Sequence, residues 1–271
     1  SQTFIIPQSD NCISEISANE STSQTYFAVT CGGVSNDKAY NIAVDSSGNT
    51  YITGYFPSTV DFGGGDVTSA SSSDIFVLKL NSSGVFQWVK TYGGTSNEYG
   101  YDIALDSSGN TYITGTFLGT VDFGGGNITA AVLIDTFVIK TNSSGVFQWV
   151  KTYGDTSADF GYGIAVDSSS NVYITGYFVG TVDFGGGNVT SVGNQDIFVL
   201  KLNSSGEFQW INNYGDTLSD WGYGVAVDSS SNVYITGYFI GTVDFGAGEI
   251  TSAGAGDIVV FKTNSSGGGI E

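Results

Sequence analysis

A unit of 61 residues repeats four times along this chain, and no other feature constrains its fold as strongly. Each unit carries an Asp-Ser-Ser turn, then the segment TVDFG, then a β-rich segment that ends in NSSG. No insertion or deletion interrupts the register of these motifs. The turn aspartates mark the repeat, at Asp45, Asp106, Asp167 and Asp228.

Within the first unit, four segments read as β-strands. Residues 40–45 alternate between apolar and polar side chains, and residues 50–56 are rich in β-branched and aromatic residues. Residues 74–81 and 85–93 form a second hairpin, because the Asn-Ser-Ser-Gly sequence between them has the residues that tight turns prefer. The stretch 57–73 between the two hairpins is predicted to form a minor hairpin around three glycines.

Four antiparallel strands per unit, repeated radially, are typical of a propeller blade, so we expect an all-β, four-bladed β-propeller. A stacked β-solenoid is the alternative, although its coils are usually shorter. The last unit stops before its fourth strand, whereas residues 25–33 align without gaps onto 86–94, with Phe27 in the place of Trp88. The N-terminal strand is therefore predicted to complete the last blade, either in cis or by strand exchange in trans, and to remove an exposed edge.

These alignments divide the chain into an N-terminal arm, 1–24, and a single propeller domain, 25–271. The apolar arm and the completing strand are candidates for assembly between molecules. The candidate assembly residues are Phe4, Ile5, Ile6, Tyr26, Phe27 and Val29. The repeats span about 40–94, 101–155, 162–216 and 223–267.

The series AVDSSGNTYITGYF, TVDFGGG and DIFVLKLNSSGVFQWVKTYGG resembles the SBBP propeller repeats of secreted and surface bacterial proteins. The resemblance covers about residues 25–267 and implies a propeller and an exported location, but no activity. The chain departs from the family in having four repeats, too few for a seven-bladed ring within one chain. Its unit is also longer than the roughly 40–50 residues usual for propeller repeats.

Composition excludes several classes of partner. The net charge is −19 and all seven cationic residues are lysines, which argues against nucleic acid and anionic membranes. No apolar run approaches the roughly 20 residues that span a bilayer, so no membrane insertion is expected. The absence of Met predicts that a signal peptide has been removed and that the chain is extracellular or on the cell surface. Cys12 and Cys31 then suit one disulfide, with two free thiols as the alternative.

Catalytic residues are scarce. The chain has no His, and with both Cys paired the Ser–His, Cys–His and His–metal sites are unavailable. Sixteen of the 26 acidic residues fill four repeat columns, which indicates a framework role and not one distinctive acid–base pair. We therefore expect no enzyme, no catalytic or cofactor-binding residues and no metal site. Asp45, Ser47 and Asn49 faintly resemble a calcium loop, but an Asx turn is the favoured interpretation and calcium the weaker one.

One repeat column combines aromatic rings with carboxylates in the loops between blades. Such a pair holds a sugar by stacking and hydroxyl hydrogen bonds, and an inter-blade contact is an equally good interpretation. Its members are Tyr99, Phe160, Trp221, Glu98, Asp159 and Asp220. For the Trp88, Trp149 and Trp210 column, packing between blades is the preferred interpretation over sugar stacking.

Seven Asn-x-Ser/Thr sequons are candidate glycosylation sites, although a chain rich in Ser and Thr contains several by chance. Four of them are also the hairpin-turn asparagines, which the turn prefers for conformational reasons. They lie at Asn19, Asn81, Asn127, Asn142, Asn188, Asn203 and Asn264.

Two functions fit these observations. The first is a non-enzymatic extracellular structural protein, a propeller subunit of a surface layer, appendage or filament whose partners are copies of itself. The second is a secreted lectin-like or adhesive propeller that binds glycans at repeated sites and gains affinity through multivalency.

Overall fold

The computed structural model describes residues 2–9, 12–19 and 24–268, and side chains from Phe27 onward. Within these residues the secondary structure consists of strands β1 to β24. No helix in the described part of the chain is long and apolar enough to cross a membrane.

The first blade is a four-stranded antiparallel sheet with a minor hairpin between its second and third strands, as the sequence predicts. The strands of the sheet are β4 (Lys38–Val44), β5 (Thr50–Phe56), β8 (Asp74–Leu80) and β9 (Phe86–Tyr92). The minor hairpin is β6 (Thr59–Asp61) and β7 (Asp66–Thr68).

The second blade has the same order but fuses its main and minor hairpins into two long strands. Residues 130–134 read Ala-Ala-Val-Leu-Ile, where the first unit has the Ser-rich stretch 69–73, and their β propensity extends the ladder through Leu118 and Ile134. The strands are β10 (Tyr99–Leu105), β11 (Thr111–Asp122), β12 (Asn127–Thr141) and β13 (Phe147–Tyr153).

The third blade repeats the first, and the fourth blade has three strands in its main sheet. The third blade contains β14 (Phe160–Val166), β15 (Val172–Phe178), β16 (Thr181–Asp183), β17 (Asn188–Thr190), β18 (Asp196–Leu202) and β19 (Phe208–Tyr214). The fourth contains β20 (Trp221–Val227), β21 (Val233–Phe239), β22 (Thr242–Asp244), β23 (Glu249–Thr251) and β24 (Asp257–Thr263).

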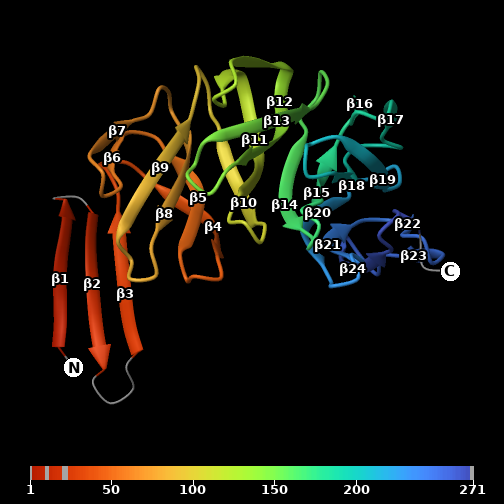
Figure 1. Cartoon of the computed structure of the whole chain (residues 1–271). Coiled ribbons are helices and arrows are strands. Elements are labelled where there is room, and N and C mark those ends of the chain that lie inside the picture. Colours follow the sequence, from red (N-terminus) through yellow and green to blue (C-terminus); the bar gives the residue numbers. More distant parts are fainter. Residues whose placement is uncertain (1, 10–11, 20–23, 269–271) are drawn as a thin grey trace.

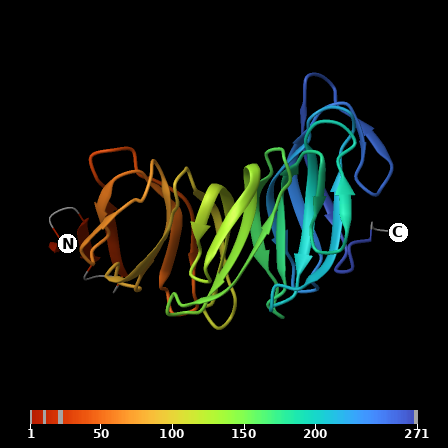
Figure 2. The same cartoon turned by 90° about the horizontal axis from the view of Figure 1, so that it is seen from above.

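The four blades follow one another in an arc, with the N-terminal sheet at one end and the fourth blade at the other (Figure 1; Figure 2). The first strands of successive blades are neighbours, in the order β4, β10, β14 and β20. Apolar side chains fill the space between blades; for example, Ile75 and Val77 of the first blade share a core cluster with Ile113 and Phe137 of the second. The chain is thus an all-β, four-bladed propeller whose blades are held together face to face.

The N-terminal sheet is separate from the fourth blade and consists of β1 (Gln2–Ser9), β2 (Cys12–Asn19) and β3 (Gln24–Cys31), in that order. The expectation that residues 25–33 complete the last blade within the same molecule is not met here. Strand β3 pairs with β2 and packs on the first blade, at the end of the arc away from β24 (Figure 1). Strand exchange in trans stays a prediction.

Candidate functional site

The outer face of the fourth blade is exposed although its sequence matches a buried interface. Ile258 and Val260 are 86% and 68% exposed. The same repeat positions of the third blade, Ile197 and Val199, are fully buried in a core cluster with the fourth blade. This end of the arc therefore presents a blade-to-blade interface that no described residue covers.

The opposite end of the arc presents the complementary face. Ile42, on the first strand of the first blade, is 57% exposed, whereas the equivalent Ile103 and Ile164 of the next two blades are only 4% exposed. Val44 on the same strand is also exposed. The two ends thus carry the two halves of one interface, which the interior of the arc repeats three times.

Strand β3 covers part of the first-blade face and lies where the outer strand of a preceding blade would lie. The Phe27 ring contacts Gly84 of the first blade, just as Trp88 contacts Gly145 and Trp149 contacts Gly206 in the interior. Among the described strands, β3 pairs with β2 alone, so its other edge has no described partner. The N-terminal strand therefore holds the outer-strand position, and the described strands include no inner strands for that blade.

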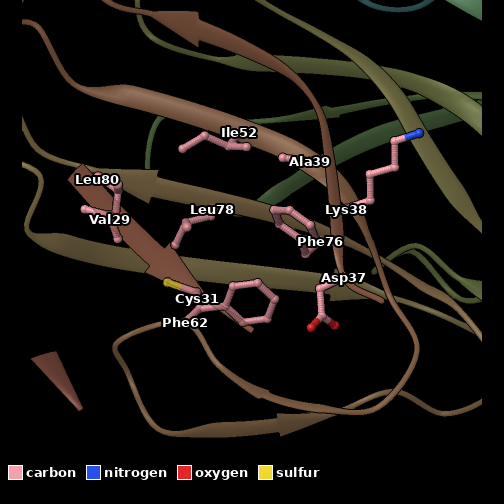
Figure 3. Close-up of a pocket in the computed structure, with 10 residues that line it drawn as sticks. All are labelled: Val29, Cys31, Asp37, Lys38, Ala39, Ile52, Phe62, Phe76, Leu78 and Leu80. Atoms are coloured by element: carbon pink, nitrogen blue, oxygen red, sulfur yellow. The ribbon is translucent and has the colours of Figure 1, made fainter. Parts of the chain in front are cut away.

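Apolar grooves mark the uncovered parts of both ends. A cavity of about 180 Å³ lies between β3 and the first blade, where Val29 and Cys31 face Phe76 and Leu78 (Figure 3). Beside it is an open groove of about 420 Å³ whose lining includes Ile42. A groove of about 250 Å³ indents the fourth-blade end, and its lining includes Val260, Phe245, Ile250, Val259 and Phe261.

A belt of aromatic rings follows the first strands of the blades. Tyr40, Tyr101, Tyr162 and Tyr223 occupy one repeat column, and their successive ring centroids are 5.1, 5.3 and 5.6 Å apart. This tyrosine column is not among the predicted site residues, although its members repeat every 61 residues in the sequence. The predicted ligand-surface column joins the same belt: Tyr99, Phe160 and Trp221 are half-buried beside Tyr101, Tyr162 and Tyr223.

The acidic residues of that predicted surface are buried. Glu98, Asp159 and Asp220 are at most 2% exposed. The carboxylate of Asp159 accepts hydrogen bonds from the backbone N–H groups of Asp155 (3.1 Å) and Val179 (3.0 Å). These bonds connect the loop that contains Asp155 to the third blade. Of the two interpretations for these carboxylates, their burial favours the inter-blade contact over an exposed sugar site.

Burial also changes the titration of these acids, because a carboxylate removed from water is less stable in its charged form. It raises the pKa of Glu98 to about 8, that of Asp159 to about 7 and that of Asp220 to about 6. The backbone hydrogen bonds oppose the shift without cancelling it.

Asp102, which is not among the predicted site residues, links three blades through hydrogen bonds. Its Oδ1 accepts from Asn41 Nδ2 (2.5 Å) of the first blade and its Oδ2 from the Ile164 N–H (2.8 Å) of the third. Burial raises its pKa to about 6. The equivalents of Asp102 in the later repeats are Gly163 and Gly224, and this departure from the repeat is the sequence signal that could have identified Asp102.

A comparison with protein families identifies the repeat. The family model described as SBBP, beta-propeller repeat, matches residues 31–55, 87–116, 148–177 and 209–238. The chain contains four SBBP β-propeller repeats. The later matches run from the outer strand of one blade into the next blade, and the first begins at the end of β3. The first match therefore lacks the outer strand with which each later match begins.

Other similarities of this SBBP chain are more distant. It is 25% identical over 268 residues to "Uncharacterized WD repeat-containing protein L264" of Acanthamoeba polyphaga mimivirus. The match covers 79% of this chain and spans only 19% of that relative's length. Two solved structures of glucose dehydrogenase are 9% and 10% identical to the chain, each with a TM-score of 0.35. Both matches cover 87% of this chain, and they cover 92% and 91% of the respective glucose dehydrogenase chains. A similarity at this level carries no argument about activity.

The Asp-Ser-Ser turns of the SBBP chain are Asx turns. Asp45 Oδ1 accepts from the N–H groups of Ser47 (2.9 Å) and Asn49 (3.0 Å), and the other turn aspartates do the same. Desolvation acts to raise the pKa of Asp45, but these hydrogen bonds outweigh it and leave the pKa lowered. Among the described residues, no group of three or more acidic, Cys or His side chains could hold a metal ion.

The tryptophan column packs between blades. Trp149 and Trp210 each donate from Nε1 to a backbone carbonyl in the turn of the following blade, at Ser204 (3.2 Å) and Ser265 (3.1 Å). These bonds, and the contact between Trp88 and Gly145, show that the tryptophan rings pack against the following blade.

The sequons fall into two groups. In the hairpin turns, Asn81 Oδ1 accepts from the N–H groups of Ser83 and Val85, and the equivalent asparagines, Asn142, Asn203 and Asn264, do likewise. In contrast, Asn127 and Asn188 are exposed at the tips of minor hairpins.

Part of the N-terminal prediction concerns side chains outside the described part, namely those of residues 1–26. These include Phe4, Ile5, Ile6, Asn19 and Tyr26. Cys31 is disulfide-bonded, and the only other cysteine of the sequence, Cys12, is its register partner between β2 and β3. Phe27 and Val29 lie against the first blade, as described above.

Proposed function

We propose that this SBBP chain is a non-enzymatic structural protein outside the cell, whose copies join head to tail through the two ends of the arc. The observation that carries the proposal is the exposure of Ile258 and Val260 at one end and of Ile42 at the other. Each belongs to a repeat column whose interior members are buried between blades. Burying such surfaces stabilises by roughly 25 cal/mol per Å² of apolar area.

A second copy of the chain is the occupant that fits both ends. The fourth-blade end has three strands and an exposed apolar face, and the first-blade end has an outer strand, β3, without inner strands beside it. Docking the two ends places β24 of one copy beside the edge of β3 that faces away from β2 in the next copy, which completes a four-stranded blade. Because the two surfaces differ, the contact is heterologous and builds a filament unless the rotation closes a ring.

The extracellular location rests on separate observations. A disulfide at Cys31 suits an oxidising compartment. Exposed sequons at Asn127 and Asn188 are accessible to glycosylation, if the source cell carries it out.

The net charge of −19 opposes association of the copies at low ionic strength. Association is therefore measured at physiological ionic strength, where exposed charges are screened beyond about 8 Å.

The alternative, a lectin-like propeller whose repeated glycan sites lie at the aromatic–acid column, lacks an observation of this kind. The carboxylates of its candidate column are buried and its aromatic rings pack on tyrosines. We therefore favour assembly.

A pair of charge substitutions tests the proposal. Val260→Asp blocks the fourth-blade end and Ile42→Asp blocks the first-blade end, so each variant keeps one functional end. We expect each to be monomeric alone and the mixture to form one-to-one dimers that grow no further, measured by analytical ultracentrifugation. Val192→Asp, at an exposed valine (63%) in a loop of the third blade, is the matched control and should assemble normally. Mixed variants that remain monomeric would contradict the proposal.

A further inference from the structure

A polar groove of about 450 Å³ lies between the turns of the first and second blades. Its residues include Asp45 and Tyr51 from the first blade, the Lys79 ammonium, and Gly109 from the second blade. Val44 and Leu105 add apolar surface. The volume falls in the range of small-molecule sites, roughly 300–1,000 Å³, which combine apolar surface with a few convergent polar groups.

The repeat is broken at this groove by a single residue. Where the second blade has Gly109, the third and fourth have Ser170 and Ser231. Ser231 Oγ donates to Asp167 Oδ2 (3.1 Å) across the blade boundary. A hydrogen bond likewise joins Ser170 to the hydroxyl of Tyr112. The two later junctions therefore each contain a serine hydroxyl that the first junction lacks.

Because the second blade has Gly109 at this position, the acceptors in the groove lack the donor that a serine would provide there. Asp45 Oδ2 accepts from Asn49 Nδ2 (2.8 Å) and from the Tyr51 hydroxyl (3.3 Å), as Asp167 Oδ2 does from its own neighbours. No bond from a serine hydroxyl to Asp45, like the one that Asp167 receives from Ser231, is found among the described residues; at the junction between them, Ser170 bonds to the Tyr112 hydroxyl and not to Asp106. A Cβ at Gly109 would lie 3.5 Å from the Tyr51 hydroxyl oxygen, so the missing hydroxyl belongs beside these acceptors.

We propose that the groove between the first and second blades binds a neutral saccharide, one of whose hydroxyl groups takes the place of the absent serine hydroxyl. That hydroxyl donates to Asp45 Oδ2. An adjacent sugar oxygen accepts from Lys79, whose ammonium has three N–H donors and uses one on the Ser143 carbonyl (3.3 Å). Val44 and Leu105 lie against the C–H face of the sugar ring.

The charges of the groove select the ligand class. The carboxylates of Asp45 and Asp106 repel an anionic sugar. The Lys79 ammonium, which lies 4.7 Å from the Tyr51 ring centroid, already provides a cation, and a metal ion beside it would be repelled. A neutral polyhydroxyl ligand supplies both the donor and the acceptor that the groove requires.

The test uses the full chain and a panel of neutral methyl glycosides, those of glucose, galactose and mannose, by saturation-transfer NMR. Gly109→Ser restores the serine of the later repeats, and the variant folds because Ser170 and Ser231 adopt the same left-handed backbone, at φ 61° and 59°. We expect it to weaken binding at least roughly tenfold, the equivalent of one lost hydrogen bond. Gly48→Ser, at the matching turn position of the first blade (φ 80°), is the control and should bind normally.

The reverse substitution gives a gain of binding. Ser170→Gly opens the equivalent groove between the second and third blades, and the stoichiometry should rise from one saccharide per chain to two. The proposal is overturned if no glycoside of the panel binds, or if Gly109→Ser binds as the unmodified chain does. Neither result bears on head-to-tail assembly, because the substituted residues, Gly109 and Ser170, lie at junctions inside the arc.

Discussion

Replacing two equivalent isoleucines, one at a time, distinguishes the packing within a chain from the packing between chains. Ile197 is fully buried between the third and fourth blades, and Ile258, its equivalent in the fourth blade, is 86% exposed. A buried Ile→Ala change costs about 2–5 kcal/mol. We therefore expect Ile197→Ala to lower the free energy of unfolding by about 3 kcal/mol, and Ile258→Ala to lower it by less than about 0.5 kcal/mol in the dilute chain.

The cost of Ile258→Ala should appear in association instead. If a second copy covers Ile258, the substitution loses about 2 kcal/mol of burial, which weakens association roughly thirtyfold. Urea unfolding at low protein concentration measures the first quantity, and sedimentation equilibrium measures the second. The reasoning would be refuted if Ile258→Ala destabilised the dilute chain as much as Ile197→Ala, because the fourth-blade face would then be packed within the molecule.

Three further predictions concern the interior of the arc and its N-terminal strand. Burial raises the pKa of Glu98 from 4.5 to about 8, so the contribution of Glu98 to the free energy of unfolding is fully present below pH 4.5 and is lost as the pH rises through about 8. Glu98→Gln should flatten this fall in urea titrations. Replacing Cys12 and Cys31 by Ser opens a loop of roughly 19 residues and should cost about 3 kcal/mol in thermal unfolding. Tyr162→Ala removes four ring contacts and should cost about 3 kcal/mol, against about 1 kcal/mol for the 47% exposed Tyr223.

The blades themselves could be predicted from the sequence because each unit contains its own strand and turn signals. The DSSGN and NSSG turns and the alternation between them place the strands to within a few residues. The long strands of the second blade were the exception. There, residues 130–134 carry the β-branched and apolar side chains that let the ladder continue, and comparison of the units position by position would have shown it.

What the sequence could not provide was the placement of one unit against another. The column of Glu98 has an acid beside an aromatic ring in a loop, a pattern that fits an exposed site as well as a buried link. Only the packing of the blades shows that Glu98 is buried. Similarly, the alignment of residues 25–33 identifies an outer strand but not the blade it belongs to, because the repeat looks the same at every junction. The turn at Gly109 accepts either Gly or Ser, so the sequence of the turn does not show that this residue matters. The difference between Gly and Ser becomes visible only in the contacts that the residue makes with the neighbouring blade.

The central claim is that the two ends of the arc bind each other, and the native mass measured across a range of protein concentrations tests it most directly. The chain has a mass of 28.3 kDa. Head-to-tail association predicts species at multiples of this mass that grow with concentration at physiological ionic strength. A single 28.3-kDa species at every concentration, including millimolar protein, would contradict the claim.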